Sequence, residues 1–382
     1  MLDLDRLLRF AVEERASDVH LKVGARPHVR VDGALRESAQ EVLAPDDTEQ
    51  LAGRILPSDQ AAGLRYGREA DGVYSIQGVG RFRVSAFGQQ GQVAFVLRRI
   101  VPGVPGIDAL GLPPVATTLA DAPSGLVLVS GLAGSGRTST LAAMVDHVNS
   151  SRSAHIVTIE QPIEVVHTDK RAVIDQREVG RDTETFAIAL GAVAHQDPDV
   201  VVVGALPDAD TAMSALEVAG AGRLVLAVSQ AVGAPDAVTR LIDRFPPAQR
   251  APVRSLLART LQGVLCQRLL PRAGGRGRVP AVEVLVANGP VSEALADSES
   301  PEKIQALVAE GEMWGMQTFD QSLAALYRRG LVTRENALAH ATYEPAVSVM
   351  LDEADRTRAA MAAARPEMPV TEPTSEMATP LA

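Results

Sequence analysis

The chain contains little of what several protein classes require. It has one cysteine, Cys266, in 382 residues, which excludes a disulfide framework and a zinc site built from cysteines. Aromatic residues make up 3% of the chain and hydrophobic residues 46%, so the core must be built from Val, Leu, Ile and Ala. No apolar run approaches the roughly 20 residues of a membrane-spanning helix. The start, MLDLDRLLRF, carries acidic residues and is not a signal peptide.

A basic excess is also missing. The net charge is −10 at pH 7 and the sequence pI is near 5.3. This balance argues against a broad nucleic-acid-binding surface, which normally shows as an excess of Lys and Arg. We therefore expect a cytoplasmic protein with no transmembrane segment and no nucleic-acid partner, whose contact with any membrane is peripheral.

Residues 1–100 predict a small α+β domain. The first 16 residues have apolar side chains at helical spacing, and DVHLKV and HVRVDG alternate as strands do. GRFRVSAFGQQGQVAFVLRRI predicts a hairpin that turns at GQQGQ. In its first strand, Phe82, Val84 and Ala86 share one face, whereas Arg81 and Arg83 point to the other.

The rest of the chain has a different character. Residues 101–123 begin with VPGVPGIDALGLPP, whose prolines and glycines predict a linker. Residues 124–345 alternate continuous apolar runs, such as GLVLVSG and DVVVVGAL, with helical stretches, which predicts an α/β domain with a largely parallel sheet. Residues 346–382 are rich in Pro, Thr, Glu and Ala and predict a largely disordered tail that begins with at most one helix.

GLAGSGRTST, residues 131–140, nearly matches the phosphate-binding pattern G-x-x-x-x-G-K-[ST]. It follows a strand and precedes a helix, where backbone N–H groups and the helix N-terminus converge on an anion. The candidate nucleotide-binding residues here are Gly131, Gly134, Ser135, Gly136, Arg137, Thr138 and Ser139. Thr138 would supply a hydroxyl to Mg²⁺. The exception is Arg137, which keeps the positive charge of the usual lysine on a planar, longer side chain.

At this point the chain resembles the PilT/PilU-type retraction ATPases of type IV pili, within the secretion ATPase superfamily. The resemblance extends from residue 3 to about 340. It rests on ASDVHLKVGARPHVRVDG, GRFRVSAF, TIEQPIEVVH and REVGRDTETFAIALGAVAHQDPDVVVVGALPD. LIDRFPPAQRAPVRSLLARTLQGVLCQRLLP and GMQTFDQSLAALYRRGLVTRENAL resemble the family's C-terminal helical part.

The resemblance implies a PAS-like N-terminal domain and a RecA-like P-loop domain with C-terminal helices. It also implies a hexameric ring of this chain, with or without active PilT-like subunits, and ATP with Mg²⁺ between the two domains. The ring would act on an inner-membrane platform protein at the base of the pilus. The resemblance further implies that Arg81, Arg83 and Arg98 reach the phosphates and that Asp199 contacts Mg²⁺ indirectly.

The departures from the family pattern fall on residues that carry chemistry. Ala205 stands where the family has the Walker B glutamate, the expected general base, and alanine cannot accept a proton. Gln161 replaces an acidic-box aspartate, and Arg223 and Gln230 replace two histidines. The motif Ala-Ile-Arg-Asn-Leu-Ile of the retraction class is represented only by GPVSEALADS.

Two carboxylates are kept in the acidic box, Glu160 and Glu164. Both are candidates to replace the missing base, because the carboxyl ends of parallel strands face the ligand crevice. Three hypotheses follow. The chain is a catalytically degenerate, regulatory or accessory ring subunit that binds ATP weakly or not at all; or a slow but active ATPase that uses Glu160 or Glu164; or a nucleotide-independent adaptor of a pilus motor.

Overall fold

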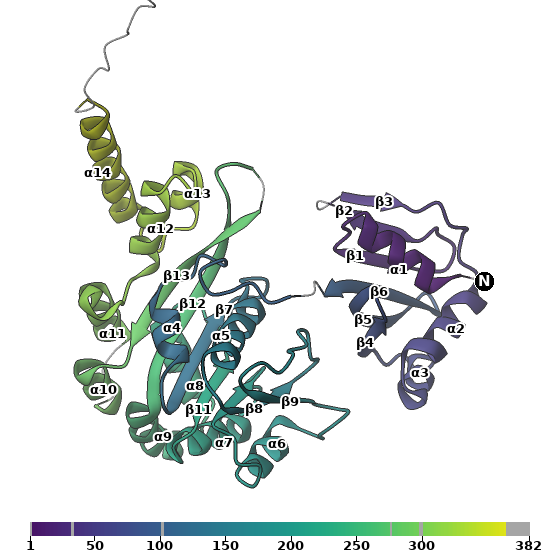
Figure 1. Ribbon diagram of the computed structural model, residues 1–382, viewed down its shortest axis with the longest axis horizontal. Coiled ribbons are helices and arrows are strands. Elements are labelled where there is room, and N and C mark those ends of the chain that lie inside the picture. Colours follow the sequence, from purple (N-terminus) through teal and green to yellow (C-terminus); the bar gives the residue numbers. More distant parts are fainter. Residues whose placement is uncertain (1, 32–33, 101–102, 276, 298–300, 364–382) are drawn as a thin grey trace, which may run out of the picture.

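The computed structural model describes residues 2–31, 34–100, 103–275, 277–297 and 301–363. Figure 1 shows two bodies joined by one connection, each built around its own β-sheet. Within the described residues, no helix is both long enough and apolar enough to cross a bilayer.

The N-terminal body holds one six-stranded antiparallel sheet in the order β3-β2-β1-β6-β5-β4. Its elements are α1 (Leu4–Glu13), β1 (Asp18–Leu21), β2 (His28–Val31), β3 (Ala34–Glu37), α2 (Pro45–Ile55), α3 (Ser58–Leu64), β4 (Ala70–Ile76), β5 (Gly80–Gln89) and β6 (Gln92–Ile100). The predicted hairpin is β5–β6, and it turns at Gln90 and Gly91, both with positive φ.

The alternation along β5 separates the core from the opposite face of the sheet. Phe82, Val84 and Ala86 are fully buried and pack with the apolar side of α1. Arg81 and Arg83 therefore leave the sheet on the other face, as the pattern predicts. The α+β N-terminal domain is confirmed.

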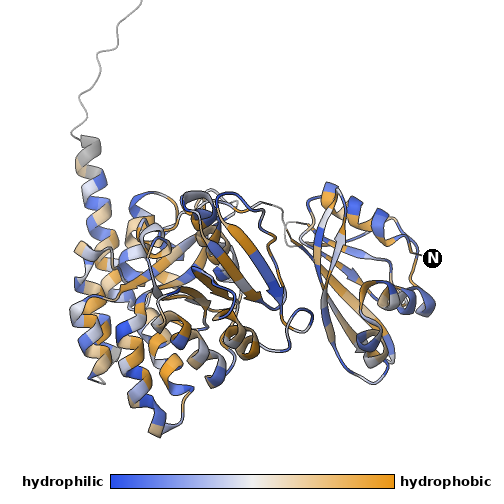
Figure 2. Ribbon diagram, turned by 60° about the horizontal axis from the view of Figure 1, so that its bottom comes forward, coloured by the Kyte–Doolittle hydropathy of each residue, from blue (hydrophilic) through white to orange (hydrophobic). Residues whose placement is uncertain are grey.

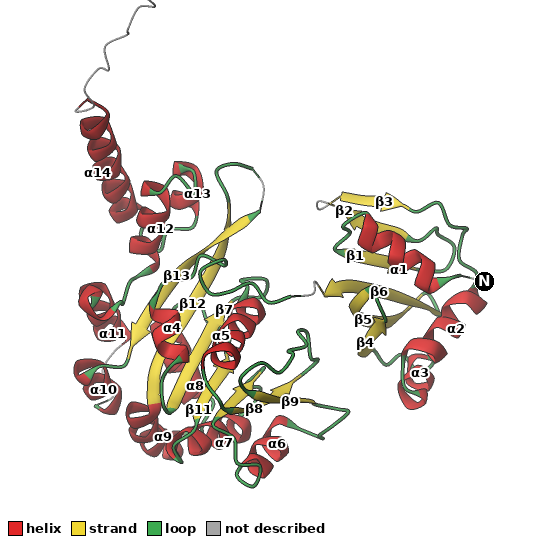
Figure 3. Cartoon of the chain, in the orientation of Figure 1, coloured by secondary structure: helices red, strands yellow, loops and turns green. Residues whose placement is uncertain are grey.

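The second body is a three-layer α/β domain (Figure 3). Its sheet has the order β13-β12-β7-β11-β10-β8-β9, and only the β12–β13 pair is antiparallel. The elements are α4 (Val115–Ala120), β7 (Gly125–Gly131), α5 (Arg137–Ser151), β8 (His155–Glu160), β9 (Val173–Glu178), α6 (Phe186–Val193), β10 (Val200–Val203), α7 (Ala209–Gly220), β11 (Leu224–Val228), α8 (Ala234–Asp243), α9 (Pro247–Thr260), β12 (Leu261–Pro271), β13 (Arg278–Val286), α10 (Gly289–Ala296), α11 (Pro301–Glu310), a 3₁₀ turn (Glu312–Trp314), α12 (Phe319–Arg328), α13 (Arg334–Ala339) and α14 (Glu344–Ala363).

The central strands β7, β10 and β11 consist mostly of apolar residues, and this composition allows both of their faces to be buried (Figure 2). On β7, Val127 and Val129 pack under α4 and α5, whereas Leu126 and Leu128 pack on the opposite helical layer. The RecA-like P-loop domain with C-terminal helices, predicted from the apolar runs and the resemblance, is confirmed.

Three segments differ from the expectation. Residues 101–102 lie outside the described part, but from Ile107 the predicted linker packs into the core beneath α5, together with α4. Its apolar side chains decide the structure here, although its prolines and glycines suggested a free connection. Leu261–Pro271, assigned by resemblance to the helical part, is instead the strand β12, and the basic loop that follows it joins two strands.

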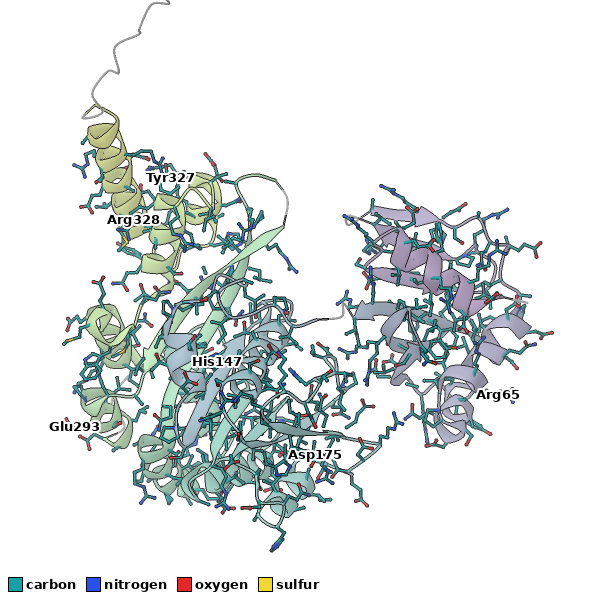
Figure 4. All side chains as sticks on the ribbon, viewed as in Figure 1. Arg65, His147, Asp175, Glu293, Tyr327 and Arg328 are labelled. Atoms are coloured by element: carbon teal, nitrogen blue, oxygen red, sulfur yellow. The ribbon has the colours of Figure 1, made fainter. Side chains whose placement is uncertain are left out.

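The third difference is α14, which crosses the predicted domain end at residue 345. Val347 and Leu351 are fully buried against the helical layer, and Tyr327 of α12 donates a hydrogen bond to Asp355 at 2.7 Å (Figure 4). The first part of the predicted tail is thus folded onto the domain. The remainder of that prediction, residues 364–382, lies outside the described residues.

Candidate nucleotide site

The phosphate loop connects the carboxyl end of β7 to the first turn of α5, at one edge of the parallel sheet. Gly131, Gly134 and Gly136 all have positive φ, at 143°, 79° and 94°. A Cβ on Gly131 would overlap the hydroxyl of Ser135 and the backbone carbonyl of Gln267, so no larger residue fits there. The turn therefore brings backbone N–H groups together at the start of a 15-residue helix, the usual arrangement for binding an anion.

The hydroxyl-bearing side chains of the loop are split between its two sides. Thr138 and Ser139, in the first turn of α5, are exposed and open to a ligand. Ser135 is buried, and its Oγ has no hydrogen-bond partner in the described structure. The exposed hydroxyl of Thr138 fits an Mg²⁺ ion held together with phosphates, because Mg²⁺ prefers oxygen ligands.

The side chain of Arg137 points toward the end of β11, the strand beside β7 in the sheet. Its Nη1 donates a hydrogen bond to the carbonyl of Ser229, just after β11, at 2.8 Å. Burial lowers the pKa of the guanidinium, and the thiol of Cys266 and the carboxylate of Glu164 oppose this shift. The cation thus remains beside the loop, but one of its donors is engaged by the protein backbone.

The end of β10 carries no acid. Gly204 donates its N–H to the carbonyl of Ile159 at 2.8 Å, and Ala205 packs its methyl group against the core. The position to which the resemblance assigns a general base is therefore occupied by a side chain without proton-accepting chemistry.

Glu160 ends β8, the strand that pairs with β10. Its Oε1 accepts hydrogen bonds from Thr158 Oγ1 at 2.7 Å and from Gln176 Nε2 at 3.1 Å. Burial raises the pKa of this carboxyl, and the two hydrogen bonds oppose the shift. Glu160 is thus a fixed, partly desolvated carboxyl at the same edge of the sheet as the phosphate loop.

Two arginines of the N-terminal body reach carboxylates of the second body. Arg83 Nη1 lies 3.2 Å from Glu164 Oε1, and Arg81 Nη2 lies 3.9 Å from Glu178 Oε2 at the end of β9. Arg81 Nε is buried without a hydrogen-bond partner. The resemblance implies that these arginines reach the phosphates; in the structure Arg83 pairs with Glu164 of the acidic box and Arg81 lies near Glu178 of β9.

Arg98 makes a different contact. Its Nε donates to the buried Asp18 at 2.8 Å, across the β1–β6 pair within the N-terminal sheet. Its side chain is otherwise 72% exposed. Arg98 is the cross-strand partner of Arg83 in the β5–β6 pair and shares its face of the sheet, but its ion-pair partner is Asp18 of the same sheet and not a carboxylate of the second body.

Asp199 lies at the opposite end of the sheet from the phosphate loop. It precedes β10, where its carboxylate accepts the His155 N–H at 2.8 Å and its own N–H donates to the His155 carbonyl. Both contacts lie at the amino end of the sheet. The four residues of β10 separate Asp199 from the phosphate-loop edge by about 13 Å, since a strand rises roughly 3.3 Å per residue. Asp199 joins β8 to β10 at the edge of the sheet opposite the phosphate loop.

Several residues of this site were not found from the sequence. Ser229, Gln176 and Glu178 each meet a predicted site residue through a contact between distant parts of the chain. Gln267 is the exception, because it carries a visible signal. It is a polar residue in the middle of the apolar run LQGVLCQRLLP, and the structure places it directly beneath the phosphate loop.

Comparisons with known proteins agree with this geometry. The sequence pattern of the family "Type II/IV secretion system protein" matches residues 2–288. The chain is 38% identical over 336 residues to the type IV pilus retraction ATPase PilT of Pseudomonas aeruginosa, covering 88% of this chain and 97% of that protein. It is 36% identical over 340 residues to the type IV pilus ATPase PilU of the same organism, covering 89% of each.

A solved structure supports the same assignment. The crystal structure of the pilus retraction motor PilT with bound ADP superposes with a TM-score of 0.83 at 38% identity, covering 91% of this chain and 100% of that one. The likeness therefore includes both bodies of the molecule.

Proposed function

The chain belongs to the type II/IV secretion system protein family and, within it, to the PilT-type pilus retraction ATPases, and from this membership we propose that it is a nucleotide-binding, catalytically degenerate subunit of a pilus motor. The observation that carries the proposal is the alanine after β10, at the same edge of the sheet as a phosphate loop that keeps its glycines and Thr138 but has Arg137 in place of lysine. Loss of a general base typically lowers turnover by 10²–10⁴-fold.

The residues present fit a nucleoside triphosphate with Mg²⁺. The N–H groups of Gly134–Thr138 and the start of α5 would hold the phosphates, with the hydroxyl of Thr138 toward the metal ion. Bound Mg²⁺ would neutralise phosphate charge. Arg137 supplies positive charge close by, and Arg81 and Arg83 stand at the acidic box on the other side.

Among the described residues, both candidate acceptors for the proton of an attacking water are engaged by other groups. Glu164 is paired with Arg83, and Glu160 accepts two hydrogen bonds on one oxygen. Binding without efficient hydrolysis is what this arrangement supports. Such a subunit would serve a ring by occupying a position and responding to nucleotide, not by supplying the chemical step.

We place this subunit in a hexameric ring in the cytoplasm, made of this chain alone or shared with active PilT-like subunits. The ring would act on the inner-membrane platform of a type IV pilus and so on twitching motility. Family membership supports this part of the proposal.

One observation favours a second function, that of a slow ATPase. The pKa of Glu160 is raised by burial, which makes its carboxylate a better proton acceptor than an exposed one. Both of its hydrogen bonds fall on Oε1. The other oxygen would then be the acceptor.

Two assays on the purified protein separate these functions and the adaptor. Binding of a fluorescent ADP analogue with Mg²⁺ is measured for the wild type and Arg137→Ala. ATP turnover is measured for both and for Glu160→Gln and Glu164→Gln. The proposal expects nucleotide binding with no turnover above that of Arg137→Ala.

Turnover that Glu160→Gln or Glu164→Gln abolishes would replace the proposal by the slow ATPase. Absence of binding, together with ring assembly that ignores nucleotide and Arg137→Ala, would replace it by a nucleotide-independent adaptor.

A further inference from the structure

Gln267 is the polar floor of the phosphate loop. It lies on β12, opposite Gly131 of β7, and is 2% exposed. Its Nε2 donates a hydrogen bond to the carbonyl of Ser135 at 3.1 Å. A Cβ on Gly136 would lie 3.3 Å from the same nitrogen, so the loop rests directly on this amide.

The hydrogen bond fixes the direction of the peptide between Ser135 and Gly136. In a trans peptide, the carbonyl of one residue and the N–H of the next point in opposite directions. Because Gln267 holds the Ser135 carbonyl toward the sheet, the Gly136 N–H is directed away from the sheet, to the side where an anion at the start of α5 would lie. Both Gly134 and Gly136 have positive φ, so the Ser135–Gly136 peptide depends on such a contact to keep one orientation.

The contact is poorly suited to stability alone. Gln267 Oε1 and Ser135 Oγ are both buried without a hydrogen-bond partner, and both residues are more than nine-tenths buried. Unpaired buried polar atoms destabilise a fold, and an apolar side chain of similar size would leave none on β12. A buried amide that destabilises the fold in this way indicates that Gln267 has a role in the nucleotide site.

We propose that Gln267 is a positioning residue of the nucleotide site, which orients the Gly136 N–H toward the phosphates of a bound nucleotide by holding the Ser135 carbonyl. The proposal rests on the nucleotide binding proposed above. It assigns to Gln267 no contact with the nucleotide itself.

The test compares Mg²⁺-dependent binding of a fluorescent ADP analogue by the full chain and three variants. Gln267→Met keeps the volume and removes the donor. Gln262→Met is the matched control, because Gln262 lies on the same strand beside Gly125, at the far end of β7. We expect Gln267→Met to weaken binding about tenfold, in line with the loss of roughly one hydrogen bond. Gln262→Met should bind as the wild type does.

The pH dependence of binding by Gln267→Glu is a measurement that a purely structural role of Gln267 would not change. A protonated carboxyl can donate to the Ser135 carbonyl, whereas a carboxylate cannot and also repels phosphate. Burial raises the pKa of a carboxyl at this place. Binding by Gln267→Glu should therefore approach that of the wild type at low pH and weaken as pH rises, beyond the pH dependence of the wild type itself, while circular dichroism shows the variant folded throughout.

The outcomes are distinct. A wild type that does not bind the ADP analogue overturns the proposed function, and this inference with it. A wild type that binds, with Gln267→Met equally tight, overturns the inference alone. If Gln267→Met is too unstable to compare, a Gln267→Glu profile parallel to that of the wild type overturns it.

Discussion

The ends of β7 and β10 lie at the same edge of one sheet, with β11 between them, and they differ in what they retain. At the end of β7, the phosphate loop keeps three glycines with positive φ. After β10, Ala205 stands where the resemblance places a general base. Part of this contrast is a folding constraint. Gly131 cannot be exchanged because Ser135 and Gln267 fill the space around it, whereas Ala205 only packs a methyl group against the core.

Residues that packing does not require are therefore the better evidence for binding. Thr138 and Ser139 are exposed, so the fold places little demand on their identity. Gln267 is buried at a cost in unpaired polar atoms. Both kinds of residue are present at the loop or directly beneath it, and a turn needed only for folding would require neither.

The strongest test of this comparison introduces an acid after β10. In an Arg137→Lys background, Ala205→Glu should raise ATP turnover by about 10²–10⁴-fold over the background alone, because a base is returned to the strand end. Turnover of Ala205→Gln in the same background is the control for size and polarity. A glutamate no better than the glutamine would show that the defect lies outside the end of β10.

The second test addresses the folding constraint. Gly131→Ala should destabilise the protein by about 3 kcal/mol, because the new Cβ meets both a side chain and backbone at a φ that other residues avoid. Gly134→Ala is the matched control. It has a positive φ but open space around it, so about 1 kcal/mol is expected. Thermal unfolding measures both, and equal losses would contradict the argument from packing.

Parts of this contrast could be predicted from the sequence, because they rest on local patterns. Continuous apolar runs predicted strands buried on both faces, and the alternation at Phe82, Val84 and Ala86 predicted which face of β5 holds Arg81 and Arg83. The glycine spacing with its strand and helix predicted the phosphate loop. In each case the signal lies within about ten residues.

The failures involve distance along the chain. Arg137 meets Ser229, 92 residues away, and Arg83 meets Glu164, 81 residues away, and no local pattern encodes either pair. Asp199 was assigned to the site because it belongs to the same motif as Gly204, although a strand separates the two ends of that motif. β12 was included in a helical part because the resemblance treated LIDRFPPAQRAPVRSLLARTLQGVLCQRLLP as one segment, although the structure divides it into α8, α9 and β12.

The third test concerns the carboxylate that Arg83 contacts. Glu164→Gln removes this partner and a negative charge near the phosphates, so the affinity for the ADP analogue should rise about threefold. The effect is small because both side chains are more than a third exposed and the pair is screened by solvent and salt. Asp175→Asn on β9, an exposed carboxylate paired with His155, should leave affinity unchanged (Figure 4). Equal responses of the two variants would mean that only net charge matters.

The smallest expected effect is on the pH dependence of stability. It tests whether burial destabilises the ionised form of Glu160. Its pKa is raised in the folded protein, so the folded state binds the proton more tightly than the unfolded chain does. The carboxyl therefore adds stability below its ordinary pKa near 4.5, and this contribution is lost as pH rises through the raised value. Glu160→Gln should melt about 2 °C above the wild type at pH 7, with the difference shrinking toward pH 4. A variant that melts lower at pH 7 would show instead that the hydrogen bonds from Thr158 and Gln176 stabilise the carboxylate. Glu160 would then have a structural role in the acidic box and would not act as a base.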